Sequence, residues 1–312
     1  MSVWSVWFNQ ANKTNQIDRI DRIDQIDRID QKDQKDQMNN DSRAKLVCVL
    51  GAAGGVGVST VAANLAVSLQ QVHRAQSVVV ADTTLTGGDL PLMLGMAPGA
   101  GLRRLPTDPQ QVDEALLMNA QAAHRSGARL LHLGHNSPVR PVAEQAVLAR
   151  TLELLARWHD WIVVDCGCAT ERIAHIVIPR ASTVLLVATL ALPSAQRAKQ
   201  WAELLINTGV PSGKLLVVMN RCREDEAAYR RQVQPLLPCR VGVYLPDSPE
   251  PAREALINGI PLVAVDSRAA LSRGYEELAL SLSGQSVGTS DKKAQGLLQR
   301  LQTRFMGTRH AA

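Results

Sequence analysis

Short apolar runs alternate with amphipathic segments along most of the chain, beginning near residue 45. Apolar runs without polar alternation are typical of strands that are buried on both faces of a parallel sheet. The predicted strands are 46–50, 77–82, 128–134, 160–167, 182–189, 215–221 and 241–247; the predicted helices are 61–72, 143–158 and 194–207, with a further helix starting within 105–124. This order predicts an α/β fold, a mostly parallel β-sheet with helices on both faces.

Candidate functional residues follow several of these strands. A glycine-rich loop follows 46–50, Asp82 and Asp165 end the second and fourth runs, and Asn220 and Pro246 lie at the ends of two later ones. Ligands of parallel α/β sheets bind at the carboxyl ends of the strands. We therefore expect these residues to lie at one edge of the sheet and to form its binding site.

The loop GAAGGVGVST, residues 51–60, has the composition of a phosphate-binding loop but contains no lysine. Glycine allows the sharp turn and the close approach of a phosphate, and consecutive backbone N–H groups at a helix N-terminus hold the anion. The Ser59 hydroxyl is placed to reach Mg²⁺. The candidate nucleotide-binding residues here are Gly54, Gly55, Val56, Gly57, Val58, Ser59 and Thr60. The alternative is a tight strand-to-helix turn that binds nothing.

Composition narrows the class of protein. The chain has 312 residues, a net charge of +5 and only 3% aromatic residues, which disfavours stacking on single-stranded nucleic acid. Its basic balance permits contact with DNA or anionic lipid but requires neither. Five cysteines, an odd number without a C-x-x-C motif, predict a reduced, cytoplasmic protein, and the close pair Cys166 and Cys168 makes an incomplete zinc site. No apolar run is long enough to cross a bilayer.

The N-terminal segment 1–41 is of low complexity, with a three-residue repeat over 17–36. Such a repeat drifts around a helix by about 60° per unit, so no continuous apolar stripe forms. We expect a disordered or weakly helical tail. An adaptor peptide and a translation start at Met38 are the alternatives.

The C-terminal segment combines a small-residue linker, 284–291, with a predicted basic amphipathic helix, 292–306. Its apolar arc includes Leu297, Leu298, Leu301 and Phe305, and Arg304 is among the flanking cations. Three uses remain open: binding to an anionic membrane surface, docking into a partner's groove, and folding back on the preceding domain. The first makes the protein peripheral to the inner membrane.

The loop resembles the deviant Walker A motif of the MinD/ParA family, x-K-G-G-x-G-K-[ST]. The leading lysine of that motif falls at Ala53 and the second at Val58. In the family, the leading lysine reaches across a dimer to the partner's nucleotide, and the second contacts phosphate. Their loss implies weakened stabilisation of charge on the terminal phosphate.

The resemblance covers residues 45 to about 283 and defines a domain at 44–283. It implies that Asp82 and Asp165 hold Mg²⁺, together with Ser59, and that Thr84 replaces the aspartate that positions the attacking water. It also implies that Asn220 and Arg221 contact adenine and that Pro246 and Asp247 begin the segment that closes over the base.

Within the family, the chain most resembles the TadZ/CpaE branch of Flp (Tad) pilus assembly proteins. The loop G-G-V-G-x-[ST]-T, segment 111–134 and the closing segment 258–282 carry this likeness. Many members have an N-terminal receiver-like domain, which is replaced here by the short repeat. The resemblance implies pilus assembly proteins as partners, and a homodimer.

We therefore expect a nucleotide-binding protein that takes ATP or ADP with Mg²⁺, hydrolyses it slowly or not at all, and organises pilus assembly at the inner membrane. The alternatives are a ParA-type partition ATPase acting on DNA and a nucleotide-free adaptor. The lost lysines and Thr84 disfavour the first alternative.

Overall fold

A computed structural model describes residues 44–83, 88–96, 106, 108–132, 143–169 and 174–284. The segments 1–41 and 292–306 and residue Thr84 lie outside the described residues, so the predictions for both tails and for the loss of the water-positioning aspartate at Thr84 stay predictions.

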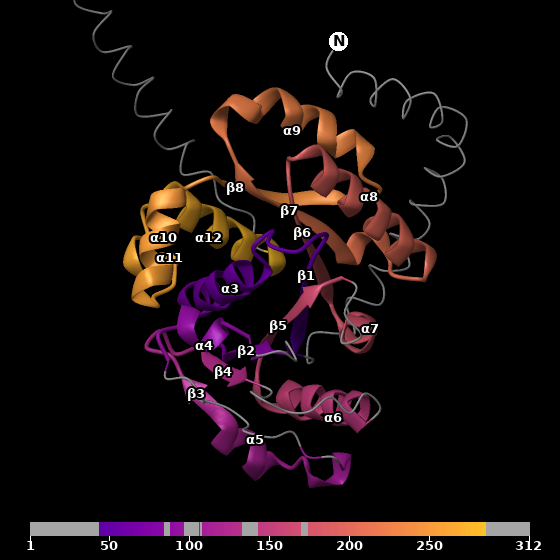
Figure 1. The fold of residues 1–312 in the computed structure, drawn as a ribbon. Helices are drawn as coiled ribbons and strands as arrows, with labels where there is room; N and C mark the ends of the chain where they lie inside the picture. The colour runs from indigo at the N-terminus through magenta and orange to yellow at the C-terminus, as the bar shows by residue number, and fades with distance from the viewer. Residues whose placement is uncertain are drawn as a thin grey trace, which may run out of the picture.

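The described residues form one eight-stranded sheet in the order β3-β4-β2-β5-β1-β6-β7-β8 (Figure 1). Neighbouring strands pair in parallel except β3 and β4, which are antiparallel. The strands are β1 (Lys45–Gly51), β2 (Val78–Asp82), β3 (Gln121–Ala123), β4 (Arg129–His132), β5 (Trp161–Cys168), β6 (Thr183–Thr189), β7 (Leu215–Cys222) and β8 (Arg240–Pro246). The mostly parallel α/β sheet predicted from the sequence is confirmed.

Helices cover both faces of the sheet (Figure 1). One face carries α3 (Val58–Val72), α4 (Leu90–Met93), α10 (Pro249–Asn258), α11 (Leu262–Val265) and α12 (Ala270–Leu282). The other face and its edges carry α5 (Glu114–Ala120), α6 (Ala143–Trp158), α7 (Ala174–Val177), α8 (Leu192–Asn207) and α9 (Ala227–Val233). The shorter 3₁₀ turns are η1 (Pro109–Gln111), η2 (Ile178–Arg180), η3 (Ser212–Lys214), η4 (Glu224–Glu226) and η5 (Gln234–Leu236). Strand side chains alternate between the two layers, so each face has its own apolar core.

The helix after the glycine-rich loop begins at Val58, earlier than the predicted 61, because Gly57 acts as its N-cap. The sequence pattern did not predict β3, the three-residue strand QAA. A turn brings β3 back against β4: Gly127 has φ +96°, and the N–H of His124 donates to the carbonyl of Ala128 over 2.8 Å. Pairing with β4, rather than the composition of QAA, makes this segment a strand.

The helix that follows the loop is joined to the end of the domain. The Asn64 side chain, on α3, donates to the Thr60 carbonyl over 2.9 Å and accepts from the Val263 N–H of α11 over 3.2 Å. Asn64 is buried, as are Leu271 and Tyr275 of α12, in the core that α3 shares with that helix. The glycine-rich loop is therefore linked through α3 to the last described helix.

Candidate functional site

The glycine-rich loop connects β1, which is buried from Leu46 to Gly51, to α3. Its start is fixed to β6, because the Ala52 N–H donates to the Val187 carbonyl over 2.9 Å. Its end is Gly57, the N-cap of α3, which has φ +98° and offers no side chain to cap the helix. The first amides of α3 are thus available to an anion, which the positive end of the helix dipole also favours.

The loop surface is open at two of its glycines. A Cβ atom added to Gly54 or Gly55 would meet nothing within 4 Å, whereas one added to Gly57 would lie 2.6 Å from Nδ2 of Asn220. Gly54 and Gly55 therefore leave room for a ligand against the backbone, and Gly57 lets a neighbouring strand approach the loop. These features fit a phosphate cradle.

The side chains at the two positions that match the family's lysines carry no charge and lie against the apolar core. Val58 is 9% exposed, and one of its methyl groups would lie 2.7 Å from a Cβ added to Gly51. Ala53 is half-buried and packs against the same core as Val58. The loop therefore offers a ligand its backbone and the half-buried Ser59 and Thr60, without a cation.

Two buried carboxylates lie side by side at the carboxyl ends of neighbouring strands. Asp82 on β2 is directly opposite Asp165 on β5 in the strand register. The Gly167 N–H donates to Oδ1 of Asp165 over 3.0 Å, and the Thr83 hydroxyl donates to the Asp165 carbonyl over 2.5 Å. The sequence prediction that both aspartates meet at one edge is in agreement with this geometry.

His132, at the end of β4, is the neighbour that sequence reasoning missed. It is paired in register with Asp82, and its Nδ1 lies 3.3 Å from Oδ2 of that residue. Both side chains are buried. The prediction treated His132 only as part of an apolar run, and the sheet order that places β4 beside β2 is what reveals the pair.

The donor types at this edge fit Mg²⁺ held largely through water and phosphate. Within the described part of the chain, no group of three or more His, Cys, Asp or Glu side chains is arranged to hold a metal ion. Magnesium commonly needs only one or two carboxylates, with waters and substrate phosphates completing its shell. Asp82, Asp165 and Ser59 would supply the protein's share.

The cysteines beside Asp165 pack as apolar residues. The sulfur atoms of Cys166 and Cys48 are 3.4 Å apart and fully buried between β5 and β1. Burial raises the pKa of the Cys166 thiol, and the contact with Cys48 raises it further, so the thiol stays neutral. Thiolate is the metal ligand, and this environment disfavours it.

Asn220 braces the loop from β7. Its Nδ2 donates to the Val56 carbonyl over 2.8 Å, and its Oδ1 accepts from the Arg221 N–H over 2.9 Å. Arg221 has φ +55°, the one positive φ outside glycine among the described residues. The predicted contact of Asn220 with adenine would have to use its second N–H and remaining lone pair, which the amide retains.

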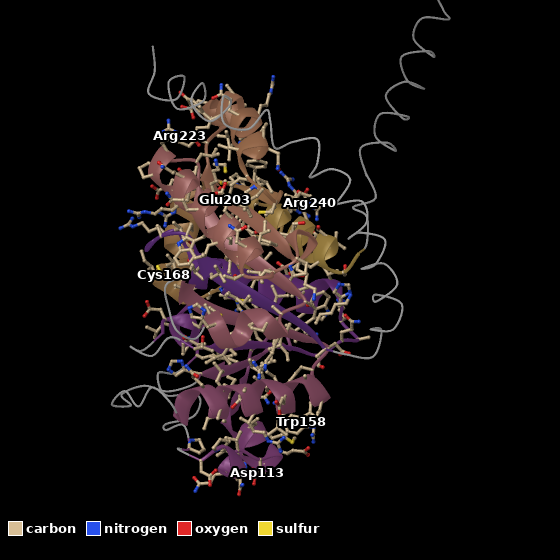
Figure 2. The ribbon with its side chains drawn as sticks, turned by 90° about the vertical axis from the view of Figure 1, so that its right-hand side faces the viewer. Asp113, Trp158, Cys168, Glu203, Arg223 and Arg240 are labelled. Carbon is tan, nitrogen blue, oxygen red and sulfur yellow. The ribbon has the colours of Figure 1, made fainter. Side chains whose placement is uncertain are left out.

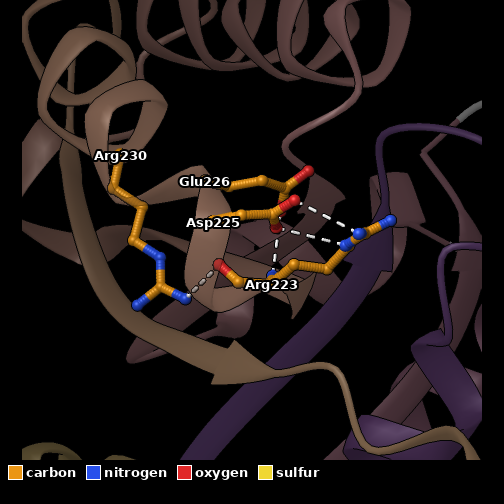
Figure 3. Close-up of polar contacts among 4 residues, drawn as sticks. All are labelled: Arg223, Asp225, Glu226 and Arg230. Atoms are coloured by element: carbon orange, nitrogen blue, oxygen red, sulfur yellow. Dashed lines mark hydrogen bonds and ion pairs between the residues drawn. The ribbon is translucent and has the colours of Figure 1, made fainter.

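The chain beyond Arg221 is held by a compact polar cluster (Figure 3). The Arg223 N–H donates to the Glu226 carboxylate over 2.9 Å, and the Arg223 guanidinium donates to both oxygens of Asp225 over 3.2 Å. Arg230 donates to the Arg223 carbonyl over 3.0 Å. These contacts fix the course of the chain just after the Asn220–Arg221 turn.

The end of β8 joins the same edge. The Asp247 N–H donates to the carbonyl of Cys222, at the end of β7, over 3.0 Å, and Pro246 is opposite Cys222 in register. The loop, Asp165, Asn220 and Pro246 thus share the carboxyl edge of the sheet, as predicted. Leu297, Leu298, Leu301, Arg304 and Phe305 lie outside the described residues.

Comparison with known proteins finds ParA and MinD proteins similar to this chain. The ParA family model, described as "NUBPL iron-transfer P-loop NTPase", matches residues 42–178. A putative septum site-determining protein MinD of Guillardia theta is 25% identical over 272 residues, covering 85% of this chain and 98% of that protein.

Solved structures share the fold. A ParA family ATPase from Chlorobium tepidum TLS superposes with a TM-score of 0.66 at 22% identity, covering 76% of this chain and 98% of its own. The septum site-determining protein MinD of Pyrococcus horikoshii OT3, solved as a complex with Mg-ADP, gives a TM-score of 0.62 at 19% identity, covering 77% and 96%. Among the described residues, no helix is long and apolar enough to cross a membrane.

Proposed function

We propose that this chain, whose fold and relatives support a ParA/MinD-like P-loop protein, binds ATP or ADP with Mg²⁺ at the glycine-rich loop and acts as a nucleotide-responsive organiser rather than a working ATPase. The observation that carries the proposal is the uncapped N-terminus of α3 beneath an open Gly54–Gly55 surface. The relative in complex with Mg-ADP shares this fold, which supports nucleotide as the ligand.

Slow or absent hydrolysis is part of the proposal. Val58 and Ala53 place apolar side chains where the related motif has lysines, and Thr84 stands where it has an aspartate. A charge-assisted contact to phosphate contributes about 1.5–3 kcal/mol, so loss of one lowers affinity roughly ten- to a hundredfold. We expect micromolar or weaker binding and little stabilisation of the transition state.

Calorimetry of the full chain with ATP–Mg²⁺ and with ADP–Mg²⁺ tests binding. Gly54→Val is the matched variant, because position 54 has open space and does not need a positive φ, so the substitution fills the cradle without straining the fold. Heat of binding in the wild type that Gly54→Val removes would support the proposal. No heat at millimolar nucleotide would leave the nucleotide-free adaptor as the better reading.

Steady-state phosphate release separates the organiser from a partition ATPase. We expect a rate far below that of a competent ParA protein, and no rescue by Val58→Lys alone, because that substitution leaves Thr84 in the place of the water-positioning aspartate. Turnover at the rate of a competent ParA protein would contradict the proposal and favour the DNA-partition alternative.

The biological setting that we propose is the positioning of an Flp (Tad) pilus assembly machine at the inner membrane. It is supported by the TadZ/CpaE-like loop and by segments 111–134 and 258–282. Affinity purification of the tagged chain, with Gly54→Val as the matched bait, tests it. Recovery of pilus assembly proteins by the wild type supports the setting, and recovery of partition or division proteins instead contradicts it.

A further inference from the structure

An open pocket of about 460 Å³ lies beside the first half of the glycine-rich loop. It is bounded by the loop residues Gly51–Gly54, by Cys168 and Ala169 just beyond Asp165, and by one stripe of α8. Figure 2 looks onto this side of the molecule, with Cys168 of β5 and Glu203 of α8 labelled. The pocket therefore opens at the same edge of the sheet as the candidate site.

The α8 stripe consists of residues three and four apart: Arg197, Gln200, Trp201 and Leu204. This spacing places them on one face of the helix, next to the buried stripe of Ala198, Ala202 and Leu205 that fixes α8 to the sheet. Within the described lining of the pocket, Arg197 alone carries a charge, and no acidic side chain faces it there. Arg197 is exposed, and none of the ion pairs found among the described residues includes it.

We propose that Arg197 supplies the positive charge for the terminal phosphate of a bound nucleoside triphosphate, in place of the lysines that the loop lacks. This inference rests on the proposed nucleotide binding. The charge comes from α8, outside the loop, on a side chain that lines the same pocket as Ala53 and Gly54.

The chemistry of the pocket supports a terminal phosphate. In nucleotide sites a metal ion and positively charged side chains offset the charge of the terminal phosphate, so a cation near the metal ligands and the loop would suit that phosphate. Here the pocket that Arg197 lines is also lined by the segment after Asp165 and by the start of the loop. Arginine presents a fork of donors that matches phosphate oxygens and keeps its charge in every environment.

The test is the affinity of the full chain for ATP and for ADP, each with Mg²⁺, in the wild type and in Arg197→Ala. ADP lacks the terminal phosphate, so Arg197→Ala should lower ATP affinity roughly ten- to a hundredfold and leave ADP affinity nearly unchanged. Arg197→Lys, which keeps the charge but loses the fork, should fall between the two.

Lys199→Ala is the matched control. It removes one positive charge from the same helix, where Lys199 pairs with Glu203 over 3.7 Å and does not line the pocket. This control should keep the wild-type ratio of ATP to ADP affinity. Thermal unfolding of each ligand-free variant checks that the fold is retained.

The phosphate could belong to the same copy or to a nucleotide on a second copy. A mixture of the Arg197→Ala and Gly54→Val proteins distinguishes the two arrangements. The Arg197→Ala protein keeps an intact loop, and the Gly54→Val protein keeps Arg197. Recovery of ATP affinity in the mixture assigns Arg197 to a second copy's phosphate, and no recovery assigns it to its own; either result supports the proposal.

The proposal is overturned if the wild type and Arg197→Ala show the same ratio of ATP to ADP affinity, or if Lys199→Ala changes that ratio equally. It is distinguishable from the proposed function: a wild type that binds ATP and ADP equally refutes only the role of Arg197. A wild type that binds neither refutes both.

Discussion

Replacement of Gly57 by alanine tests whether the hydrogen bond from the Asn220 side chain to the Val56 carbonyl stabilises the glycine-rich loop. The new Cβ would lie 2.6 Å from Nδ2 of Asn220, and the backbone would keep φ +98°, which L-residues rarely adopt. The backbone strain is worth about 1–2 kcal/mol. Displacing the amide breaks its 2.8 Å bond to the Val56 carbonyl, which contributes about 0.5–1.5 kcal/mol. We expect Gly57→Ala to lower the free energy of unfolding by about 1.5–3.5 kcal/mol.

The assay is urea unfolding of the ligand-free chain, followed by circular dichroism, with Gly54→Ala as the control. A Cβ at position 54 meets nothing within 4 Å, so this variant should stay within about 0.5 kcal/mol of the wild type. Because the clash involves one named side chain, Gly57→Ala combined with Asn220→Ala should lose less than the sum of the two single changes. Additive losses, or a Gly57→Ala protein as stable as the wild type, would refute the reasoning.

Three further outcomes follow from the structure. Burial, with a smaller contribution from Arg129, lowers the pKa of His159 to about 4, so the folded state resists protonation of this side chain. The free energy of unfolding should therefore fall as the pH drops from about 6.5 to 4. Measured as a function of pH, this fall should be smaller in His159→Gln. Arg221→Gly relieves a φ of +55° and should leave the free energy of unfolding unchanged or raise it by up to about 1 kcal/mol, whereas Arg221→Val should lower it in the same unfolding assay. If the segment 292–306 binds membrane, the full chain should sediment with anionic liposomes, and less of it should do so at high salt. A 1–284 truncation and Leu301→Asp should both stay in solution. If all three proteins behave alike, the segment docks on a protein partner or on the preceding domain instead.

The order of strands and helices was predictable because parallel strands buried on both faces leave unbroken apolar runs. The strands that contain Asp82 and Asp165 illustrate this, and the helix 143–158 was predicted from its amphipathic spacing. The edge strand β3 was not predictable, because its three residues have no strand pattern and depend on a partner that lies beyond a turn.

The sequence predicted which residues of the site lie at the ends of strands. It did not predict which side chains contact one another there. Asn220 and Val56 are separated by 164 positions, and nothing in either segment indicates that one amide bonds the other's carbonyl. The pairing of His132 with Asp82 likewise depends on the sheet order. The sequence pattern of α8, the helix that contains Arg197, predicts which face of the helix is buried. It does not predict that Arg197 lines a pocket with the loop, because that depends on how the helix packs in the folded chain.

The link from α3 through Asn64 to α11, and the packing of α12 on α3, have a mechanical consequence. Any force applied to the chain beyond residue 284 enters the described domain through α12. Because α12 contacts both α3 and β8, part of that load passes to the helix whose first turn follows the glycine-rich loop. A tether at the C-terminus would therefore load α3, and α3 would pass part of that load to the loop at its N-terminus.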